Sequence, residues 1–195
     1  MKLLHKFGFV ATALALALSA TSASAQGPWT GLYLGANVGY GTAADTNPKV
    51  NGVVGGIHGG YNWQFNQIVA GIEGDYSLSG MNAATTIAGT TFDMDVDSIW
   101  SIRARLGFLA TSNLMIFGTV GYGGFEAKVT ATGATIGSAS ARANGLVAGG
   151  GLEYAFTRNI VGRLEGLHFM GEGTGAFSGV DQDVTIFRTG LSYKF

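Results

Sequence analysis

The chain has 195 residues, of which 33 are Gly, 12 Phe, 7 Tyr and 3 Trp, with only 2 Pro and no Cys. Charged residues make up 12%, about half the usual share, and the net charge is −1, which argues against an ordinary soluble domain, a disordered chain and a nucleic-acid-binding protein. The absence of Cys and the scarcity of Pro also exclude a disulfide-stapled scaffold and a collagen-like chain.

Residues 1–25 have the features of a secretory signal peptide. Lys2 and Lys6 give a basic start, residues 7–20 are apolar, and Ala23-Ser24-Ala25 is a small-residue cleavage site. The apolar run is shorter than the roughly 18 residues that a membrane-spanning helix needs, which disfavours the alternative of an N-terminal anchor. We therefore expect one mature domain at residues 26–195.

The mature sequence alternates with a period of two, which predicts strands and no helix. In the first segment Leu32, Leu34, Ala36, Val38 and Tyr40 alternate with small or polar residues. The eight expected strands are residues 32–40, 53–65, 68–78, 100–108, 114–122, 146–156, 160–170 and 185–195.

Along each expected strand, alternate side chains point to opposite faces, and this alternation is here called parity. The charged residues within these strands have the parity opposite to that of the large apolar residues. They are Glu73, Asp75, Arg103, Arg105, Glu153, Arg163, Glu165, Arg188 and Lys194. In a soluble β-sandwich this parity would be the solvated face, and in a membrane barrel it would face the lumen.

The connections between the expected strands alternate in length. Short turns are expected at 66–67, 110–113 and 157–159, and long loops at 42–52, 79–95, 126–141 and 171–183. Short turns on one side and long loops on the other are typical of outer-membrane barrels.

Aromatic residues of the apolar parity gather at both strand ends, as the two interfaces of a bilayer would select. The expected outer girdle is Tyr40, Tyr76, Trp100, Tyr122 and Phe187, and the inner girdle is Trp63, Phe65, Phe108, Tyr154, Phe156, Tyr193 and Phe195. Because a sheet can cross hydrocarbon only when it is closed, we predict an all-β fold, an eight-stranded antiparallel up-and-down transmembrane β-barrel.

An eight-stranded bore is too narrow to leave its charges hydrated, so they are expected to pair. Symmetric hairpins place Glu153 opposite Arg163 and His58 opposite Asp75, and we expect Arg188 to reach Glu165 from a non-adjacent strand. This network would fill the lumen, and a narrow aqueous pore is the alternative.

The segments at 29–35, 60–64, 71–75 and 151–154, followed by a terminal Phe, resemble the outer-membrane immunogenic or porin-family proteins of alphaproteobacteria. The resemblance covers the mature chain, except that Gly166-Leu167-His168 departs from the Tyr-rich family pattern. It implies residence in the outer membrane among its lipids. It also implies insertion by the barrel-assembly machinery, with Leu191, Tyr193 and Phe195 as the assembly signal.

Catalytic and metal sites have weak support in the sequence. His168, Glu172 and Ser178 could form the acid–base set of a lipid-modifying enzyme, but without a defined motif we expect no enzyme. Asp93, Asp95 and Asp97 lack an EF-hand spacing and are interpreted as a solvated acidic loop. We expect no metal and no cofactor.

The sequence thus predicts a monomeric structural barrel that supports the envelope and exposes loops to the outside. The alternatives are a small-solute porin, a receptor for a ligand such as haem, and a lipid-modifying enzyme. No specific ligand follows from the residues.

Overall fold

Alternating side chains produce long strands through most of the chain that the structure describes. This computed structural model describes residues 28–43, 50–133, 136–175 and 181–195, so the expected signal peptide at 1–25 lies outside it. In the described residues no helix is long and apolar enough to cross a membrane. The strands are β1 (Gly31–Ala43), β2 (Val50–Phe65), β3 (Ile68–Ile87), β4 (Thr90–Leu109), β5 (Leu114–Gly133), β6 (Gly137–Ala155), β7 (Ile160–Gly175) and β8 (Asp181–Lys194).

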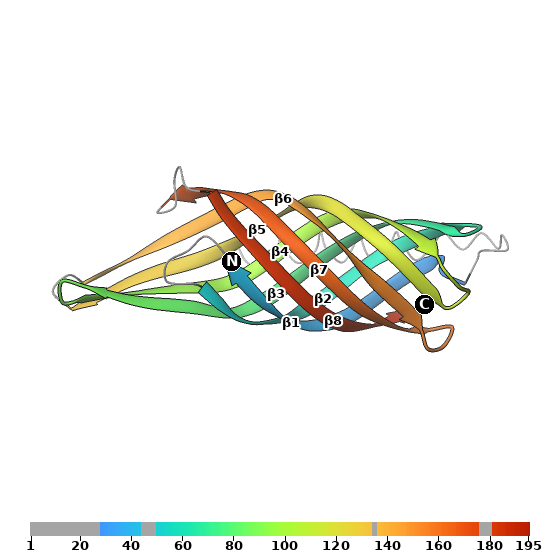
Figure 1. The fold of residues 1–195 in the computed structure, drawn as a ribbon, viewed down its shortest axis with the longest axis horizontal. Helices are drawn as coiled ribbons and strands as arrows, with labels where there is room; N and C mark the ends of the chain where they lie inside the picture. The colour runs from blue at the N-terminus through green and yellow to red at the C-terminus, as the bar shows by residue number, and fades with distance from the viewer. Residues whose placement is uncertain (1–27, 44–49, 134–135, 176–180) are drawn as a thin grey trace, which may run out of the picture.

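The eight strands form one closed antiparallel barrel. Each strand pairs with the next in sequence, and β1 pairs with β8, for example at Val38 and Thr189. Figure 1 shows the strands steeply tilted against the long axis of the molecule. Closure gives the backbone groups of the barrel wall partners on both sides, which a sheet in hydrocarbon requires. The predicted eight-stranded barrel is confirmed.

The expected short turns all lie at one end, which we call the turn end. Asn66 and Gln67 connect β2 to β3, and Asn66 adopts a φ of 55°. Residues 110–113 and 156–159 make the other two turns. In these turns the hydroxyls of Thr111 and Thr157 each accept hydrogen bonds from two backbone N–H groups further along the chain. The C-terminus lies at the same end (Figure 1).

Two of the expected long loops are wrong. At 79–95 the strands continue to Ile87 and resume at Thr90, joined by Ala88 and Gly89 at φ 50° and 78°. Positive φ at both residues is the type I′ geometry that suits a tight hairpin. At 126–141 β5 likewise runs to Gly133 and β6 begins at Gly137. The strands persist because pairing does not need an apolar outer face, which was the signal used to delimit them.

The other two expected loops are shorter than the ranges 42–52 and 171–183. The strands extend to residue 43 and from 50 on one side, and to 175 and from 181 on the other. The intervening residues 44–49 and 176–180 lie outside the described part of the chain.

Four strands rise beyond the barrel at the end opposite the turns. The last pair between β2 and β3 is Asn51 and Asn82, and the last between β6 and β7 is Ala141 and Gly175. Beyond them, among the residues that the structure describes, β3 to β6 continue at residues 83–94, 129–133 and 137–139, which we call the extension (Figure 1). Register shifts at Leu78/Met81 and Val96/Ser98 mark its base, where irregular pairing lets a sheet bend.

Candidate functional site

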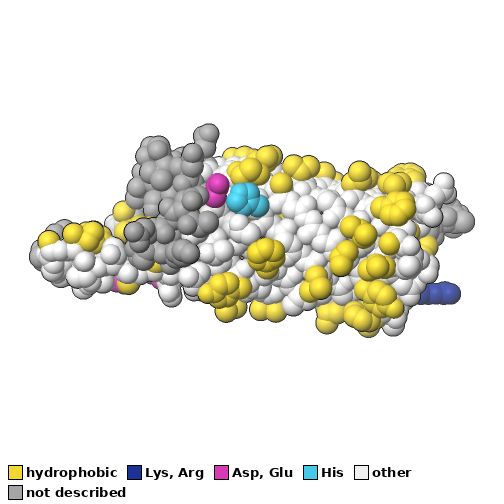
Figure 2. Space-filling model, viewed as in Figure 1, with side chains coloured by type: hydrophobic (Ala, Val, Ile, Leu, Met, Phe, Trp, Pro, Cys, Tyr) yellow, Lys and Arg dark blue, Asp and Glu magenta, His cyan; other side chains and the backbone are white. Residues whose placement is uncertain are grey.

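The outer wall of the barrel is apolar. Most of the expected girdle residues are exposed, and Trp100 is half-buried. Tyr76 and Trp100 are cross-strand partners, and the rings of Trp100 and Tyr122 are 6.2 Å apart. At the turn end the Tyr193 and Phe195 rings are 5.1 Å apart. Figure 2 shows apolar side chains over much of this wall, with the few visible charged groups toward its ends.

The inside of the barrel is filled in three layers, and β7 contributes to each. From the turn end its inward residues are Val161, then Arg163 and Glu165, then Leu167 and Phe169. All five are buried. The layers are therefore apolar, charged and apolar along the same strand.

The middle layer, which we call the charge cluster, consists of four carboxylates and four guanidinium groups. Its members are Glu73, Asp75, Arg103, Arg105, Glu153, Arg163, Glu165 and Arg188. At most 4% of any of these side chains is exposed. Equal numbers of opposite charges compensate one another, which a buried position demands.

Lys194 was expected in this network and does not join it. Its side chain is half-exposed at the turn end, and Nζ donates a hydrogen bond to the carbonyl of Pro28. Its inward parity was interpreted correctly, but its place at the very end of β8 leaves it near solvent.

Glu73 is the centre of the charge cluster. Arg163 binds it with both terminal nitrogens, Nη1 to Oε1 at 2.9 Å and Nη2 to Oε2 at 2.5 Å. Arg103 Nη2 reaches Oε1 at 2.5 Å, and the Tyr33 hydroxyl donates to Oε2 at 2.7 Å. Arg105 Nη1 lies 3.3 Å from the same Oε2. Planar guanidinium groups are suited to such two-point contacts with carboxylates.

The expected pair of Glu153 and Arg163 is formed. The two residues are cross-strand partners on β6 and β7, and Arg163 Nε donates to Glu153 Oε1 at 2.7 Å. Arg105 Nη2 lies 2.8 Å from the same oxygen. Arg163 thus bridges Glu153 and Glu73, which lie on different strands.

The pair of Arg188 and Glu165 is also formed, with Arg188 Nε 2.7 Å from Glu165 Oε2. Its origin corrects our expectation, because the two residues are partners on the adjacent strands β7 and β8. Arg188 also contacts Asp75 at 3.3 Å, and Arg103 Nη2 lies 2.8 Å from Asp75 Oδ1.

His58 lies opposite Asp75 in the register, as expected, but the two side chains do not pair. His58 Nε2 lies 2.7 Å from Ser192 Oγ, and Nδ1 lies 3.3 Å from Asn37 Nδ2. Because an amide nitrogen only donates, Nδ1 accepts and Nε2 carries the proton that bonds Ser192. Ser192 on β8, which like His58 is a partner of Gly35 on the intervening strand β1, therefore takes the place expected for Asp75. The register of the β2–β3 hairpin alone could not reveal this contact.

Two aromatic rings support the charge cluster and were missed from the sequence. Arg105 lies over the Phe117 ring at 4.5 Å, and Arg163 lies over the same ring at 5.5 Å. Tyr33 lies under both guanidinium groups at 5.5 and 5.9 Å. Parity could have revealed Tyr33, since it lies between the outward Leu32 and Leu34 and therefore on the face of small and polar residues.

Apolar side chains close the lumen on either side of the charge cluster. The turn-end apolar cluster is Trp29, Val69, Leu109, Met115, Phe117 and Val161. The extension-end apolar cluster is Ala43, Val50, Val54, Met81, Val96, Ile99, Phe125, Ala127, Ala143, Val147, Leu167, Phe169, Val184 and Ile186. Trp29 caps the turn end, where Nε1 donates to the Ser112 carbonyl at 3.1 Å. These apolar layers were not expected, because the inward positions of the sequence predicted only charges and small or polar residues in the lumen.

The other expected polar sites are dispersed. Asp93, Asp95 and Asp97 lie on β4 and not in a loop, because the hairpin continues past them. Among the side chains that the structure describes, no group of three or more His, Asp or Glu could hold a metal ion. Of the proposed enzymatic set, only the side chain of His168 is described, and it lies on the outer wall. The structure does not describe the side chain of Glu172 or the position of Ser178.

Comparison with known proteins gives one family and several relatives. A model of the outer membrane protein beta-barrel domain matches residues 11–195. The 31 kDa outer-membrane immunogenic protein of Brucella melitensis is 30% identical over 205 residues, which cover 86% of this chain and 84% of that protein. The 25 kDa outer-membrane immunogenic protein of the same organism is 32% identical over 183 residues, covering 87% and 81%.

Solved barrels share the fold at lower identity. Neisserial surface protein A superposes with a TM-score of 0.57 at 16% identity, covering 85% of this chain and 98% of that one. OprG from Pseudomonas aeruginosa gives a TM-score of 0.57 at 13% identity, covering 88% and 99%. These likenesses bear on architecture alone.

Proposed function

The chain belongs to the outer membrane protein β-barrel family and lies in the outer membrane, and from this premise we propose that it is a sealed structural barrel. Its work is to support the envelope and to present its extension outside the cell. The turn end faces the periplasm and the extension faces outward, as in barrels with short periplasmic turns.

The three filled layers of the lumen carry this proposal. A solute crossing the middle layer would have to separate Arg163 from Glu73 and Glu153, which it contacts at 2.5 to 2.9 Å. It would then meet the extension-end apolar cluster, in which Met81, Ile99 and Val147 are buried. Breaking a buried ion pair and hydrating an apolar layer both cost free energy, so steady permeation is disfavoured.

Planar-bilayer recording tests the seal. We expect the purified protein to show no steady conductance above protein-free bilayers and above bilayers that received unfolded protein. Large, regular single-channel steps would contradict the seal and favour the small-solute porin.

The envelope role is tested by deleting the gene and restoring either the full chain or a chain with a shortened β3–β4 hairpin. Asn82 and Asp95 are cross-strand partners, so an Asn-Gly turn can replace residues 83–94 between them. We expect both versions to restore detergent resistance. A deletion strain whose detergent resistance equals that of the parent strain would contradict the envelope role. Haem binding by the full chain but not by the shortened chain would favour the receptor.

A catalytic role is not part of the proposal. A lipid-acyl hydrolysis assay on the wild-type protein and His168→Ala distinguishes a structural barrel from a lipid-modifying enzyme. Activity that disappears in the variant would establish the lipid-modifying enzyme.

Assembly is proposed to depend on the last strand and the barrel-assembly machinery. Leu191, Tyr193 and Phe195 are exposed on the lipid-facing wall, and the Phe195 N–H donates to the Leu32 carbonyl at 2.9 Å where β8 meets β1. Removing Phe195 is expected to lower the folded fraction in the outer membrane while synthesis continues. An unchanged fraction in a pulse-chase experiment would contradict this assignment.

We propose a monomer, whose partners in the membrane are lipids.

A further inference from the structure

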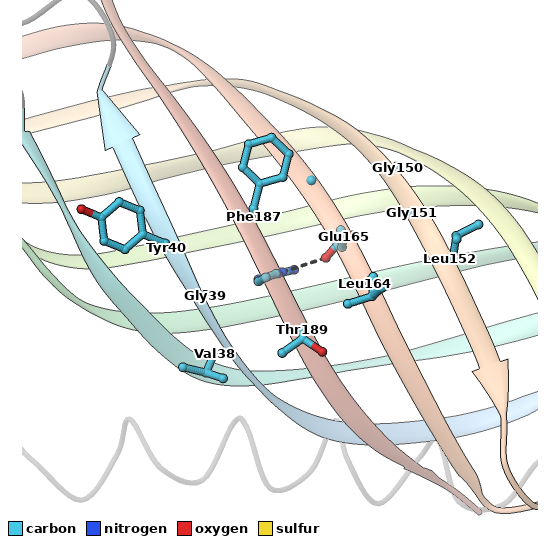
Figure 3. A pocket seen from close by; sticks show the side chains of 12 residues that line it. Val38, Gly39, Tyr40, Gly150, Gly151, Leu152, Leu164, Glu165, Phe187 and Thr189 are labelled. Atoms are coloured by element: carbon cyan, nitrogen blue, oxygen red, sulfur yellow. Dashed lines mark hydrogen bonds and ion pairs between the residues drawn. The ribbon is translucent and has the colours of Figure 1, made fainter.

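The lipid-facing wall is hollowed over β1, β6, β7 and β8. One hollow of about 570 Å³ is lined by Tyr40, Gly150, Leu152, Leu164, Gly166 and Phe187, among others. Figure 3 shows bare backbone at Gly150 between the side chains of Phe187 and Leu152. A second hollow of about 690 Å³ shares Leu152 and Leu164 and reaches Tyr154 and Phe156 of the inner girdle. We call the two together the wall groove.

Packing inside the barrel does not explain every glycine at the bottom of the wall groove. Gly150, Gly166 and Phe187 are successive cross-strand partners on the outward face. A Cβ at Gly166 would meet only the Phe187 ring, at 3.2 Å, and that ring is exposed. A Cβ at the inward Gly149, in contrast, would lie 2.2 Å from the Gly166 carbonyl oxygen. The interior therefore requires glycine at 149, whereas at 166 a side chain would extend into the wall groove.

A polar group stands directly above the wall groove. His168 follows Gly166 by two residues on the outward face of β7, and its partner Thr185 precedes Phe187 by two on β8. His168 Nδ1 lies 2.9 Å from Thr185 Oγ1, and Nε2 lies 3.8 Å from Asp183 Oδ2. The His168 and Asp183 side chains are 46% and 36% exposed. Figure 2 shows a histidine and an acidic side chain together on this face, on the extension side of the apolar wall.

The level of these residues identifies the environment. Phe187 belongs to the outer girdle, where aromatic rings lie at the lipid headgroups, and the pair of His168 and Thr185 lies two residue pairs further out. A groove in the hydrocarbon and a polar group above it together match the two parts of a single lipid molecule. The wall groove is also continuous with the wall that lipid covers.

We propose that this site binds one acylated sugar lipid of the outer leaflet. An acyl chain lies in the wall groove over Gly150 and Gly166, between Leu164 and Phe187. Sugar hydroxyl groups exchange hydrogen bonds with His168, Thr185 and Asp183. A carboxylate accepts from hydroxyl groups but repels phosphate, so Asp183 favours the sugar over a phosphate headgroup.

The test is a binding titration on the full mature chain in detergent, followed by native mass spectrometry. The probe is a synthetic acylated glucosamine disaccharide without phosphate, and dimyristoylphosphatidylglycerol is the comparison lipid. Gly166→Leu fills the wall groove and His168→Ala removes the polar group. Gly74→Leu is the control, because Gly74 faces outward on β3 and its Cβ would meet only the Ser101 oxygen, at 3.8 Å.

We expect Gly166→Leu and His168→Ala each to raise the Kd for the disaccharide about tenfold, the change that one lost favourable contact produces. The control should stay within about twofold of wild type, and wild type should prefer the disaccharide to phosphatidylglycerol. Folding is checked for each variant by heat-modifiable gel mobility. If Gly166→Leu does not fold, the exposed His168→Ala decides the question.

Three results would overturn the proposal. Equal binding of the disaccharide by wild type and His168→Ala would show that His168 does not contribute to the site. Equal binding of the two lipids by wild type would show general lipid contact. A protein dimer lost in Gly166→Leu would assign the wall groove to a second copy of the chain.

Discussion

The charge cluster and the extension-end apolar cluster fill the same bore by different means. On β7 they are adjacent, with Arg163 and Glu165 in one and Leu167 and Phe169 in the other, and all four side chains are buried. An enclosed lumen can thus be filled with paired charges or with apolar volume. Charges need particular partners at particular distances, whereas apolar side chains need only to fit the space.

The two layers also have different neighbours. The charge cluster lies between two apolar layers inside the closed barrel. The extension-end apolar cluster continues upward, where Ala83, Met94 and Val129 of β3, β4 and β5 pack against it. This cluster therefore anchors the extension to the barrel as well as closing the lumen.

The largest effect is expected where one buried guanidinium group bridges two carboxylates. Arg163→Ala removes the two-point contact with Glu73 and the hydrogen bond to Glu153 in a buried site, and we expect it to lower the free energy of unfolding by about 3 to 5 kcal/mol. Guanidinium titration of the barrel folded in phosphatidylcholine vesicles measures the loss. A loss below about 1 kcal/mol would show that water enters the layer and hydrates the carboxylates.

The apolar layer should respond to lost volume alone. Leu167→Ala removes a side chain that is 1% exposed and is expected to lower the free energy of unfolding by about 3 kcal/mol in the same titration. Leu167→Met keeps most of the volume and serves as the control, with an expected loss below about 1.5 kcal/mol. Similar losses for both variants would contradict packing as the source of stability in this layer.

Pairing should make the charged layer non-additive. Combining Arg163→Met with Glu153→Gln removes both members of a cross-strand pair. We expect the double variant to lose about 1 to 2 kcal/mol less than the sum of the two single variants, because neither partner is left alone. Strict additivity in a double-mutant cycle would refute direct coupling between the two residues.

The smallest effect is expected where an ion pair is hydrated. Arg142 Nε lies 3.0 Å from Glu126 Oε1, but these side chains are 67% and 50% exposed. Glu126→Gln should therefore change the free energy of unfolding by less than about 0.5 kcal/mol. A larger change would show that burial is not what separates this pair from the charge cluster.

Parity and register were the most predictive features of the sequence. Side chains alternate across a strand, so the inward position of Glu73, Arg103 and Glu165 followed from counting residues. A short turn then fixes the hairpin register, which placed Glu153 opposite Arg163. The outer bounds of β3, β4, β5 and β6 did not follow, because the outward residues of the extension are polar except for Ala84 and the apolar alternation ends there.

The sequence by itself determined the strand count, the closed antiparallel order and the buried charges. These depend on local alternation and on the hydrocarbon of the bilayer, which offers the backbone no hydrogen-bond partner and so requires a closed sheet. Only the tertiary structure decided that Ser192 bonds His58, that Phe117 and Tyr33 lie against Arg105 and that Arg163 bridges Glu153 to Glu73. Several of these contacts, such as His58 to Ser192 and Arg163 to Glu73, join strands far apart in sequence. Their distances depend on the tilt and circumference of the closed barrel, which no single hairpin specifies.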